Sequence, residues 1–140
     1  MALVSDAGTP GISDPGNKLV AALSRAVPIP GPSALIAAAS IAGFSMDKFV
    51  FMGFPPVKTK RKKFFEEAAK SKYPVILYES PHRILKTLEN LSETFPDRNM
   101  VVCRELTKKF ETVYRGNARD ISIKLIADEI KGEFVIVISV

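Results

Sequence analysis

Short apolar segments rich in β-branched residues alternate along the chain with segments in which apolar residues recur every three or four positions. The first pattern is typical of buried strands and the second of amphipathic helices. The expected strands are 2–5, 26–29, 48–52, 74–79, 99–105, 110–115 and 134–139, and the expected helices are 14–25, 33–42, 60–71, 81–94 and 118–129. Strands separated by helices in this way are typical of an α/β sheet.

The helix expected at 81–94 carries the clearest local signals. Ser80 is a suitable N-cap, and Pro81 is a suitable first helical residue. Apolar residues between Ile84 and Leu91 fall on one face of this helix, so that face is expected to pack on the sheet.

Residues 5–16 read S-D-A-G-T-P-G-I-S-D-P-G and join the first apolar segment to the first helix. Asp14 is the expected N-cap of that helix, with Pro15 at its first position. Ligands of open α/β sheets bind at the carboxyl ends of strands, and glycines allow the backbone to approach them closely. The segment is therefore expected to face a ligand, although it matches neither the G-x-G-x-x-G dinucleotide fingerprint nor a P-loop.

The composition limits the class of protein. The chain has 140 residues, of which 46% are hydrophobic and 25% charged, as in an ordinary globular protein. It has no apolar run near the roughly 20 residues that span a bilayer and no basic-then-apolar leader, so a cytoplasmic location without membrane contact is expected. The chain has one cysteine, Cys103, and one histidine, His82, so an internal disulfide and the usual Cys/His zinc sites are excluded. Mg²⁺ held by carboxylates stays open, but no metal site is predicted.

The formal net charge is +5, and positive charge gathers at the start of the helix expected at 60–71. The basic residues of this cluster are Lys58, Lys60, Arg61, Lys62 and Lys63. Positive charge in a first helical turn opposes the helix macrodipole, so another interaction must favour it. A phosphate backbone is one such partner; a solvated patch paired with Glu66 and Glu67 is the alternative.

Several segments together carry a family resemblance. They are S-D-A-G-T-P-G-I-S-D-P-G at 5–16, I-P-G-P-S-A at 29–34, M-G-F-P-P at 52–56, Y-E-S-P-H-R at 78–83, C-R-E-L-T-K at 103–108 and K-G-E at 131–133. In this order they resemble the bacterial small-subunit ribosomal RNA (cytidine-2′-O)-methyltransferases, a family of the tetrapyrrole-methylase superfamily. The resemblance implies a methyltransferase that uses S-adenosylmethionine and acts on a cytidine ribose of small-subunit ribosomal RNA.

The resemblance also implies a tetrapyrrole-methylase-like α/β fold, that of the class III S-adenosylmethionine methyltransferases. Residues 1–43 are expected to be the remnant of a truncated N-terminal cofactor-binding subdomain, and residues 44–140 a complete C-terminal α/β subdomain. Two strands alone are marginal in water, so the expected strands 2–5 and 26–29 need further partners. The junction 24–27 passes from helix to strand without a turn residue, which suggests a deletion there.

The resemblance implies a set of residues that hold S-adenosylmethionine. They are Asp6, Ala7, Gly8, Thr9, Ser33, Ala34, Tyr78, Cys103 and Gly132. The alternative to cofactor binding is that Asp6, Ala7, Gly8 and Thr9 only form a tight turn and that Ser33 only caps a helix. Tyr78, Cys103 and Gly132 are expected to act through their backbone, because their side chains are typical core residues.

Methylation of a ribose 2′-hydroxyl needs alignment of a poor nucleophile and removal of its proton. Glu79 and Glu105 are the candidate catalytic residues, and both are expected on the same rim as Asp6. The residues expected to bind RNA are Lys58, Lys60, Arg61, Lys62, Lys63, Arg83, Arg104 and Lys108. The alternative for each acid and its basic neighbours is an internal ion-pair network.

Two alternative functions stay open at this point. One is methylation of a tetrapyrrole of the precorrin type, which the basic cluster disfavours. The other is a non-catalytic truncated chain that only binds RNA. The partners implied are the ribosomal RNA of the 30S subunit and a second copy of the chain in a homodimer.

Overall fold

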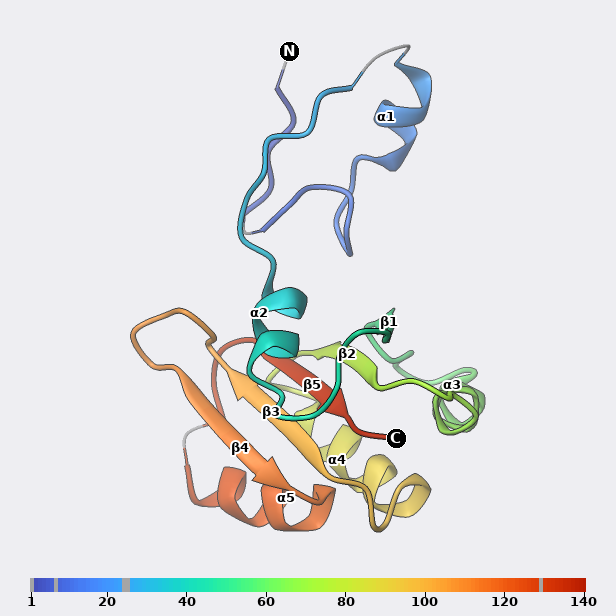
Figure 1. Cartoon of the computed structure of the whole chain (residues 1–140), viewed down its shortest axis with the longest axis vertical. Coiled ribbons are helices and arrows are strands. Elements are labelled where there is room, and N and C mark those ends of the chain that lie inside the picture. Colours follow the sequence, from blue (N-terminus) through green and yellow to red (C-terminus); the bar gives the residue numbers. More distant parts are fainter. Residues whose placement is uncertain (1, 7, 24–25, 129) are drawn as a thin grey trace.

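Five strands form one mixed sheet in the order β1-β2-β5-β3-β4, shown in the computed structural model of Figure 1. The structure describes residues 2–6, 8–23, 26–128 and 130–140. The strands are β1 (Val50–Gly53), β2 (Val75–Glu79), β3 (Met100–Arg104), β4 (Thr112–Gly116) and β5 (Phe134–Ile138). β1 runs parallel to β2, and the pairs β2–β5, β5–β3 and β3–β4 are antiparallel. These strands confirm the predictions made for residues 48–139.

Helices cover both faces of this sheet. The helices in the described part of the chain are α1 (Asn17–Ala22), α2 (Ala34–Ser40), α3 (Arg61–Ala69), α4 (Ile84–Thr94) and α5 (Ala118–Ala127). In Figure 1, α2 lies on one face of the sheet, and α4 and α5 lie on the other. α3 packs against α4 on that second face. α1 lies apart from the sheet and has no buried residue.

The two faces of the sheet belong to two hydrophobic clusters. Under α2, Ala38 and Ala42 pack with Cys103 and neighbouring strand residues. On the opposite face, Leu88 of α4 and Ile121 of α5 belong to the larger cluster. Successive residues of a strand point to opposite faces, so each strand supplies side chains to both clusters. All five residues of β5 are buried as a result.

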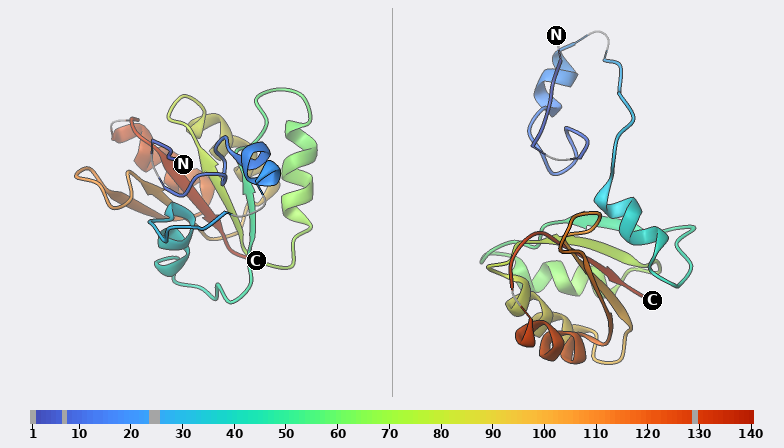
Figure 2. Two further views of the ribbon diagram at one scale, coloured as in Figure 1. Left: turned by 90° about the horizontal axis from the view of Figure 1, so that it is seen from above. Right: turned by 90° about the vertical axis from the view of Figure 1, so that its left-hand side faces the viewer.

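Most of residues 2–6, 8–23 and 26–33 lies away from the sheet, although the loop at Ser13 comes close to the end of β1 (Figures 1 and 2). The predictions of strands at 2–5 and 26–29 are wrong, because the described residues there form no strand. A strand needs a partner for its backbone hydrogen bonds, and Val4 and Ile29 are each 82% exposed. Three predictions fall on positions outside the described residues. They concern the junction at 24–25, residue 129 at the end of the helix expected at 118–129, and the site residue Ala7.

Two helix starts also differ from the predictions. α1 begins at Asn17 rather than 14, and its N-cap is Gly16 at φ 137 instead of Asp14. A Cβ at Gly16 would lie 2.6 Å from a methyl carbon of Leu3. α4 begins at Ile84, because residues 81–83 form a turn in which the Ser80 carbonyl accepts hydrogen bonds from the N–H groups of Arg83 and Ile84.

The connection between α2 and the sheet lies next to the boundary expected at residue 43, and that division stays a prediction. Gly43 adopts φ 82 just after α2. The guanidinium of Arg115, on β4, donates to the carbonyl of Ala42 at 2.8 Å. α2 is thus attached to the sheet by polar contacts as well as by its buried alanines.

We expect Leu88→Ala to lower the free energy of unfolding by about 2–5 kcal/mol, because this fully buried side chain would leave a cavity. Ile123→Ala on α5 is the control, since Ile123 is 64% exposed. The control is expected to stay within about 0.5 kcal/mol of the wild type. Urea unfolding followed by circular dichroism measures both values, and equal losses would contradict the assignment of this core.

Candidate functional site

Tyr78 lies at the centre of the candidate site, on the sheet face that carries α2. Its hydroxyl oxygen accepts a hydrogen bond from the N–H of Leu35, in the first turn of α2, at 3.2 Å. The rings of Phe51 and Phe54 pack edge-on against it, with centroids 4.8 and 5.6 Å away. β2, α2 and the segment after β1 therefore meet at one aromatic cluster.

The N-terminal loop reaches the same region. A Cβ at Gly8, which has φ 68, would lie 3.8 Å from the carbonyl oxygen of Pro32. A Cβ placed on Gly53, the last residue of β1, would lie 3.7 Å from the Ser13 hydroxyl oxygen. The structure thus brings the turn with Asp6, Gly8 and Thr9 beside the turn that precedes Ser33 and Ala34. Asp6 and Thr9 are exposed there.

Charges around Tyr78 affect its ionisation. Burial is the main cause that raises the pKa of Tyr78, and the hydrogen bond from Leu35 opposes it. The negative charges of Asp14 and Glu133 raise the pKa further. Asp14, which we did not include among the site residues, therefore lies near enough to Tyr78 to influence it. The Tyr78 hydroxyl stays neutral at physiological pH.

Cys103 occupies the middle of the sheet. It pairs with Val113 on one side and Val135 on the other, and none of its surface is exposed. Burial raises the pKa of the thiol to about 11. Tyr78 also pairs with Val135, so Tyr78, Val135 and Cys103 lie in one row across three strands. Of the two site residues in this row, Tyr78 is partly exposed and Cys103 is buried.

Gly132, Glu105, Lys108 and Glu133 form a separate polar cluster at one rim of the sheet. A carboxylate oxygen of Glu105 accepts hydrogen bonds from the N–H of Glu133 at 2.9 Å and from Lys108 at 3.1 Å. Lys108 also lies 2.9 Å from the Glu133 carboxylate. Gly132 has φ 87, and a Cβ there would overlap the Glu105 side chain. This cluster matches the ion-pair alternative considered for Glu105 and Lys108.

These contacts lower the pKa of Glu105, chiefly through the hydrogen bond from the Glu133 N–H and then through Lys108. Hydrogen bonds to the carboxylates of Glu133 and then Glu105 raise the pKa of Lys108. Glu105 also holds a left-handed backbone conformation at φ 49, which is rare for a residue with a side chain. A carboxylate with a lowered pKa is a weak proton acceptor near neutral pH.

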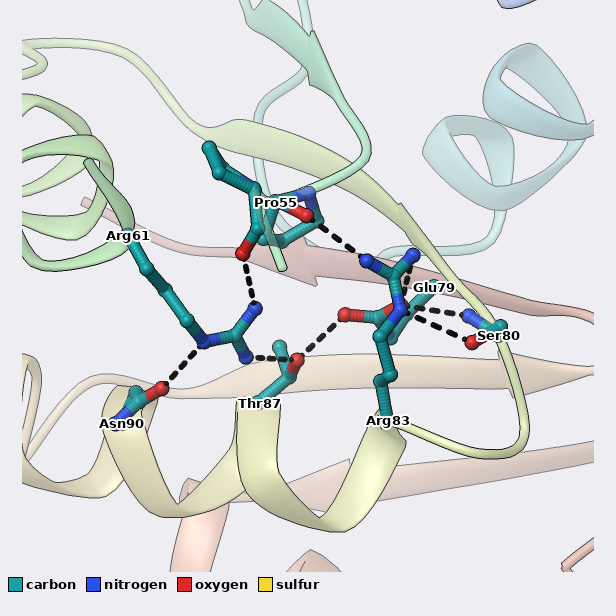
Figure 3. Close-up of polar contacts among 8 residues, drawn as sticks. Pro55, Arg61, Glu79, Ser80, Arg83, Thr87 and Asn90 are labelled. Atoms are coloured by element: carbon teal, nitrogen blue, oxygen red, sulfur yellow. Dashed lines mark hydrogen bonds and ion pairs between the residues drawn. The ribbon is translucent and has the colours of Figure 1, made fainter. Parts of the chain in front are cut away.

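Glu79 lies on the opposite face from Tyr78, which differs from the expectation that it shares a rim with Asp6. Adjacent strand residues point to opposite faces, so Glu79 is directed under α4. It forms an ion pair with Arg83 at 2.9 Å and accepts hydrogen bonds from the Ser80 N–H and the Thr87 hydroxyl at 2.8 and 2.6 Å (Figure 3). Its side chain is 0% exposed.

The basic cluster before and within α3 divides into two kinds of residue. Lys58, Lys60, Lys62 and Lys63 are exposed, and Lys62 lies 4.0 Å from Glu66. Arg61 instead points inward, where its guanidinium donates to the Pro56 carbonyl, the Thr87 hydroxyl and the Asn90 side chain. Arg83 and Arg104 are partly buried at the starts or ends of their elements, and Lys108 belongs to the rim cluster.

Sequence reasoning missed Thr87 and Asn90 as members of this polar network. Arg83, Thr87 and Asn90 are spaced by four and three residues, so they share one side of α4. Thr87 is one of the two buried polar residues among those described, the other being Glu79. A polar residue inside the apolar stripe of α4 was the signal that could have identified it.

Two negative findings concern the described residues alone. No group of three or more histidine, cysteine or carboxylate side chains there is arranged to hold a metal ion. Nor does any helix in that part of the chain have the length and apolar character to cross a membrane.

We expect Cys103 to resist a thiol reagent such as dithionitrobenzoate in the folded protein at about pH 8. A pKa of about 11 leaves little thiolate, and the side chain has no exposed surface. Reaction in urea, followed by absorbance, is expected to be complete and fast. Fast reaction without urea would contradict the central position of Cys103.

Glu105→Gln is expected to reduce the loss of stability in acid. The folded-state pKa lies below the ordinary 4.5, so the carboxylate stabilises the fold above that value and its contribution is lost as pH falls through the folded pKa. Urea unfolding at about pH 6 and about pH 3 measures this difference. Glu93→Gln on the exposed side of α4 is the control. An unchanged pH dependence in Glu105→Gln would contradict the cluster.

The sequence of this chain is similar to those of several bacterial proteins that share one name. Ribosomal RNA small subunit methyltransferase I from Xylella fastidiosa is 48% identical over 146 residues, which cover 99% of this chain and 54% of that protein. The proteins of the same name from Synechocystis and Neisseria meningitidis serogroup B are 47% and 42% identical, again over 99% of this chain and over 52% and 50% of their own lengths. The chain thus spans about half the length of these relatives.

Two solved structures share the fold. The methyltransferase CobJ superposes with a TM-score of 0.67 and 22% identity, covering 94% of this chain and 61% of that one. The cobalt precorrin-4 methyltransferase CbiF superposes with a TM-score of 0.61 and 20% identity, covering 79% and 50%. Residues 1–122 match the family described as tetrapyrrole (corrin/porphyrin) methylases. The chain belongs to the tetrapyrrole methylase family.

Proposed function

We propose that this chain is part of an S-adenosylmethionine-dependent methyltransferase that methylates a cytidine ribose 2′-hydroxyl in small-subunit ribosomal RNA. The observation that carries the proposal is identity of 42–48% over 99% of the chain to proteins named ribosomal RNA small subunit methyltransferase I. The meeting of the N-terminal loop, α2 and Tyr78 supports a ligand site, and the exposed lysines support an anionic substrate.

The proposed cofactor site lies between the loop that carries Asp6, Gly8 and Thr9 and the aromatic cluster of Phe51, Phe54 and Tyr78. The residues there suit S-adenosylmethionine: the Asp6 carboxylate suits its ammonium group, the Gly8 turn brings backbone close, and Tyr78 and Phe54 offer aromatic surface. Bound there, S-adenosylmethionine would supply an electrophilic methyl group. Thr9, Ser33 and Ala34 complete the proposed contacts. Cys103 has no exposed surface, and Gly132 packs on Glu105, so both are assigned supporting positions.

The protein's own work in this reaction is to orient the ribose and manage its proton. Glu105 lies at the rim and is the carboxylate we assign to positioning the 2′-hydroxyl. Its lowered pKa favours accepting a hydrogen bond over removing a proton. Glu79 is enclosed by its own chain, and its role is considered in the following section.

The proposed RNA surface consists of the exposed lysines Lys58, Lys60, Lys62 and Lys63. Arg104 stays a predicted RNA contact. Arg83 pairs with Glu79, and Lys108 pairs with Glu105 and Glu133, so these two are assigned supporting positions. Exposed lysines bind phosphates as point charges and give affinity that falls as salt rises. They carry little information about base sequence. The 30S subunit as substrate, a homodimer and a cytoplasmic location are part of this proposal.

The first test is calorimetric titration of this chain with S-adenosylmethionine and S-adenosylhomocysteine. We expect binding in roughly the micromolar range that Asp6→Ala weakens by about tenfold or more, because the variant removes the partner of the ammonium group. Asp97→Ala, an exposed aspartate beyond α4, is the matched control and is expected to bind as the wild type does. Binding unaffected by Asp6→Ala would contradict the proposed site.

The second test is methyl transfer from radiolabelled S-adenosylmethionine to bacterial 30S subunits, with digestion to identify 2′-O-methylcytidine. Formation of that nucleoside supports the proposal. Methylation of a precorrin in place of RNA would overturn it in favour of a tetrapyrrole substrate. RNA binding without cofactor binding would show that this chain by itself is a binding module.

A further inference from the structure

Pro55 and Pro56 follow β1 and lead to the exposed lysines. Proline has no N–H, so the carbonyl oxygens are the only backbone groups through which these two residues can be hydrogen-bonded. Arg83 donates to the Pro55 carbonyl at 3.1 Å, and Arg61 donates to the Pro56 carbonyl at 2.9 Å (Figure 3). Two arginines from different helical segments therefore hold consecutive carbonyls.

Glu79 connects these two arginines. One carboxylate oxygen pairs with Arg83 at 2.9 Å, and the other accepts the Thr87 hydroxyl proton at 2.6 Å. The Thr87 oxygen in turn accepts a hydrogen bond from Arg61, also at 2.6 Å. Figure 3 shows Glu79, Thr87 and the two arginines as one continuous network beside Pro55.

The network depends on its buried negative charge. A buried carboxylate is tolerated only when donors surround it, and removing one partner of a buried pair leaves an uncompensated charge. Burial lowers the pKa of Arg61, while the charge of Glu79 opposes that effect. Asn90 accepts from the Arg61 Nε at 2.9 Å and fixes the plane of the guanidinium. Few alternative arrangements satisfy all of these groups.

The network lies between the exposed lysines proposed to bind RNA and the aromatic cluster proposed to hold the cofactor. On one side, the exposed residues 57–60 follow Pro56 and precede Arg61 in the chain, and among them Lys60 has a left-handed conformation at φ 66. Surrounding contacts must hold such a conformation in place. On the other side, Phe54 packs against Tyr78 and lies 6.0 Å from the Arg83 guanidinium.

We propose that Glu79 is a positioning residue: through Arg83, Thr87 and Arg61 it fixes residues 54–60. It thereby sets where the exposed lysines meet RNA and how Phe54 lies against Tyr78. This inference rests on the proposed function for the RNA surface. The network itself is independent of the ligand.

The test uses Arg61→Lys, Thr87→Val and Glu79→Gln, with Arg119→Lys on exposed α5 surface as control. Arg61→Lys keeps the charge but cannot reach the same three acceptors, and Thr87→Val removes the bridging hydroxyl at similar volume. Glu79→Gln changes no exposed group. Arg61→Lys and Thr87→Val keep the test decisive if Glu79→Gln fails to fold.

The first measurement is hydrogen exchange by mass spectrometry of a peptide that covers residues 57–64, in which the N–H groups of Arg61 and Phe64 donate to the carbonyls of Lys58 and Lys60. We expect exchange about tenfold or more faster in the folded network variants, with the strands unchanged and Arg119→Lys equal to the wild type. Wild-type exchange in folded Arg61→Lys and Thr87→Val would overturn the inference, whatever the chain binds.

The second measurement is affinity for small-subunit ribosomal RNA between about 50 and about 250 mM KCl. If the network positions the lysines, the slope of log affinity against log salt falls in magnitude by about one in Arg61→Lys, although no charge is lost. A thermally destabilised variant with an unchanged slope would overturn the positioning role. Absence of wild-type RNA binding would instead refute the proposed function, and hydrogen exchange would then decide the network alone.

Discussion

The burial of β5 on both faces is the constraint on which the rest of the structure depends. β5 lies between β2 and β3, and all five of its residues are enclosed. Such a strand can exist only if helices cover both sides, so α2 is required on one face and α4 with α5 on the other. Every site residue on β2 and β3 takes its direction from this arrangement.

The alternation of side chains along β2 separates two kinds of chemistry. Tyr78 points toward α2 and the N-terminal loop, where an aromatic cluster and small residues suit a ligand. Glu79 points under α4, where three donors surround its carboxylate. Neighbouring residues of one motif therefore serve different purposes, one at a candidate binding surface and one in an internal network.

The charged residues sort in the same way. Exposed lysines before and within α3 can exchange water and ions for phosphates at little cost, whereas Arg61 and Arg83 are committed to carbonyls of their own chain. Arginine suits the internal role because its planar group donates in several directions at once. The neighbouring lysines suit the surface role because each carries one flexible charge. The basic segment 58–63 thus contains both exposed lysines and an arginine, Arg61, whose hydrogen bonds hold the segment in place.

The sequence by itself determined the strands and helices from residue 48 onward, because their apolar periodicity reports burial directly. It also identified the family through motifs in order. It did not decide the state of residues 2–5 and 26–29, because a strand exists only where another strand accepts its hydrogen bonds. Nor did it decide the roles of Glu79 and Arg61, which depend on partners such as Thr87 and Pro56. Only the tertiary structure decides such contacts, because distance in space is independent of distance along the chain.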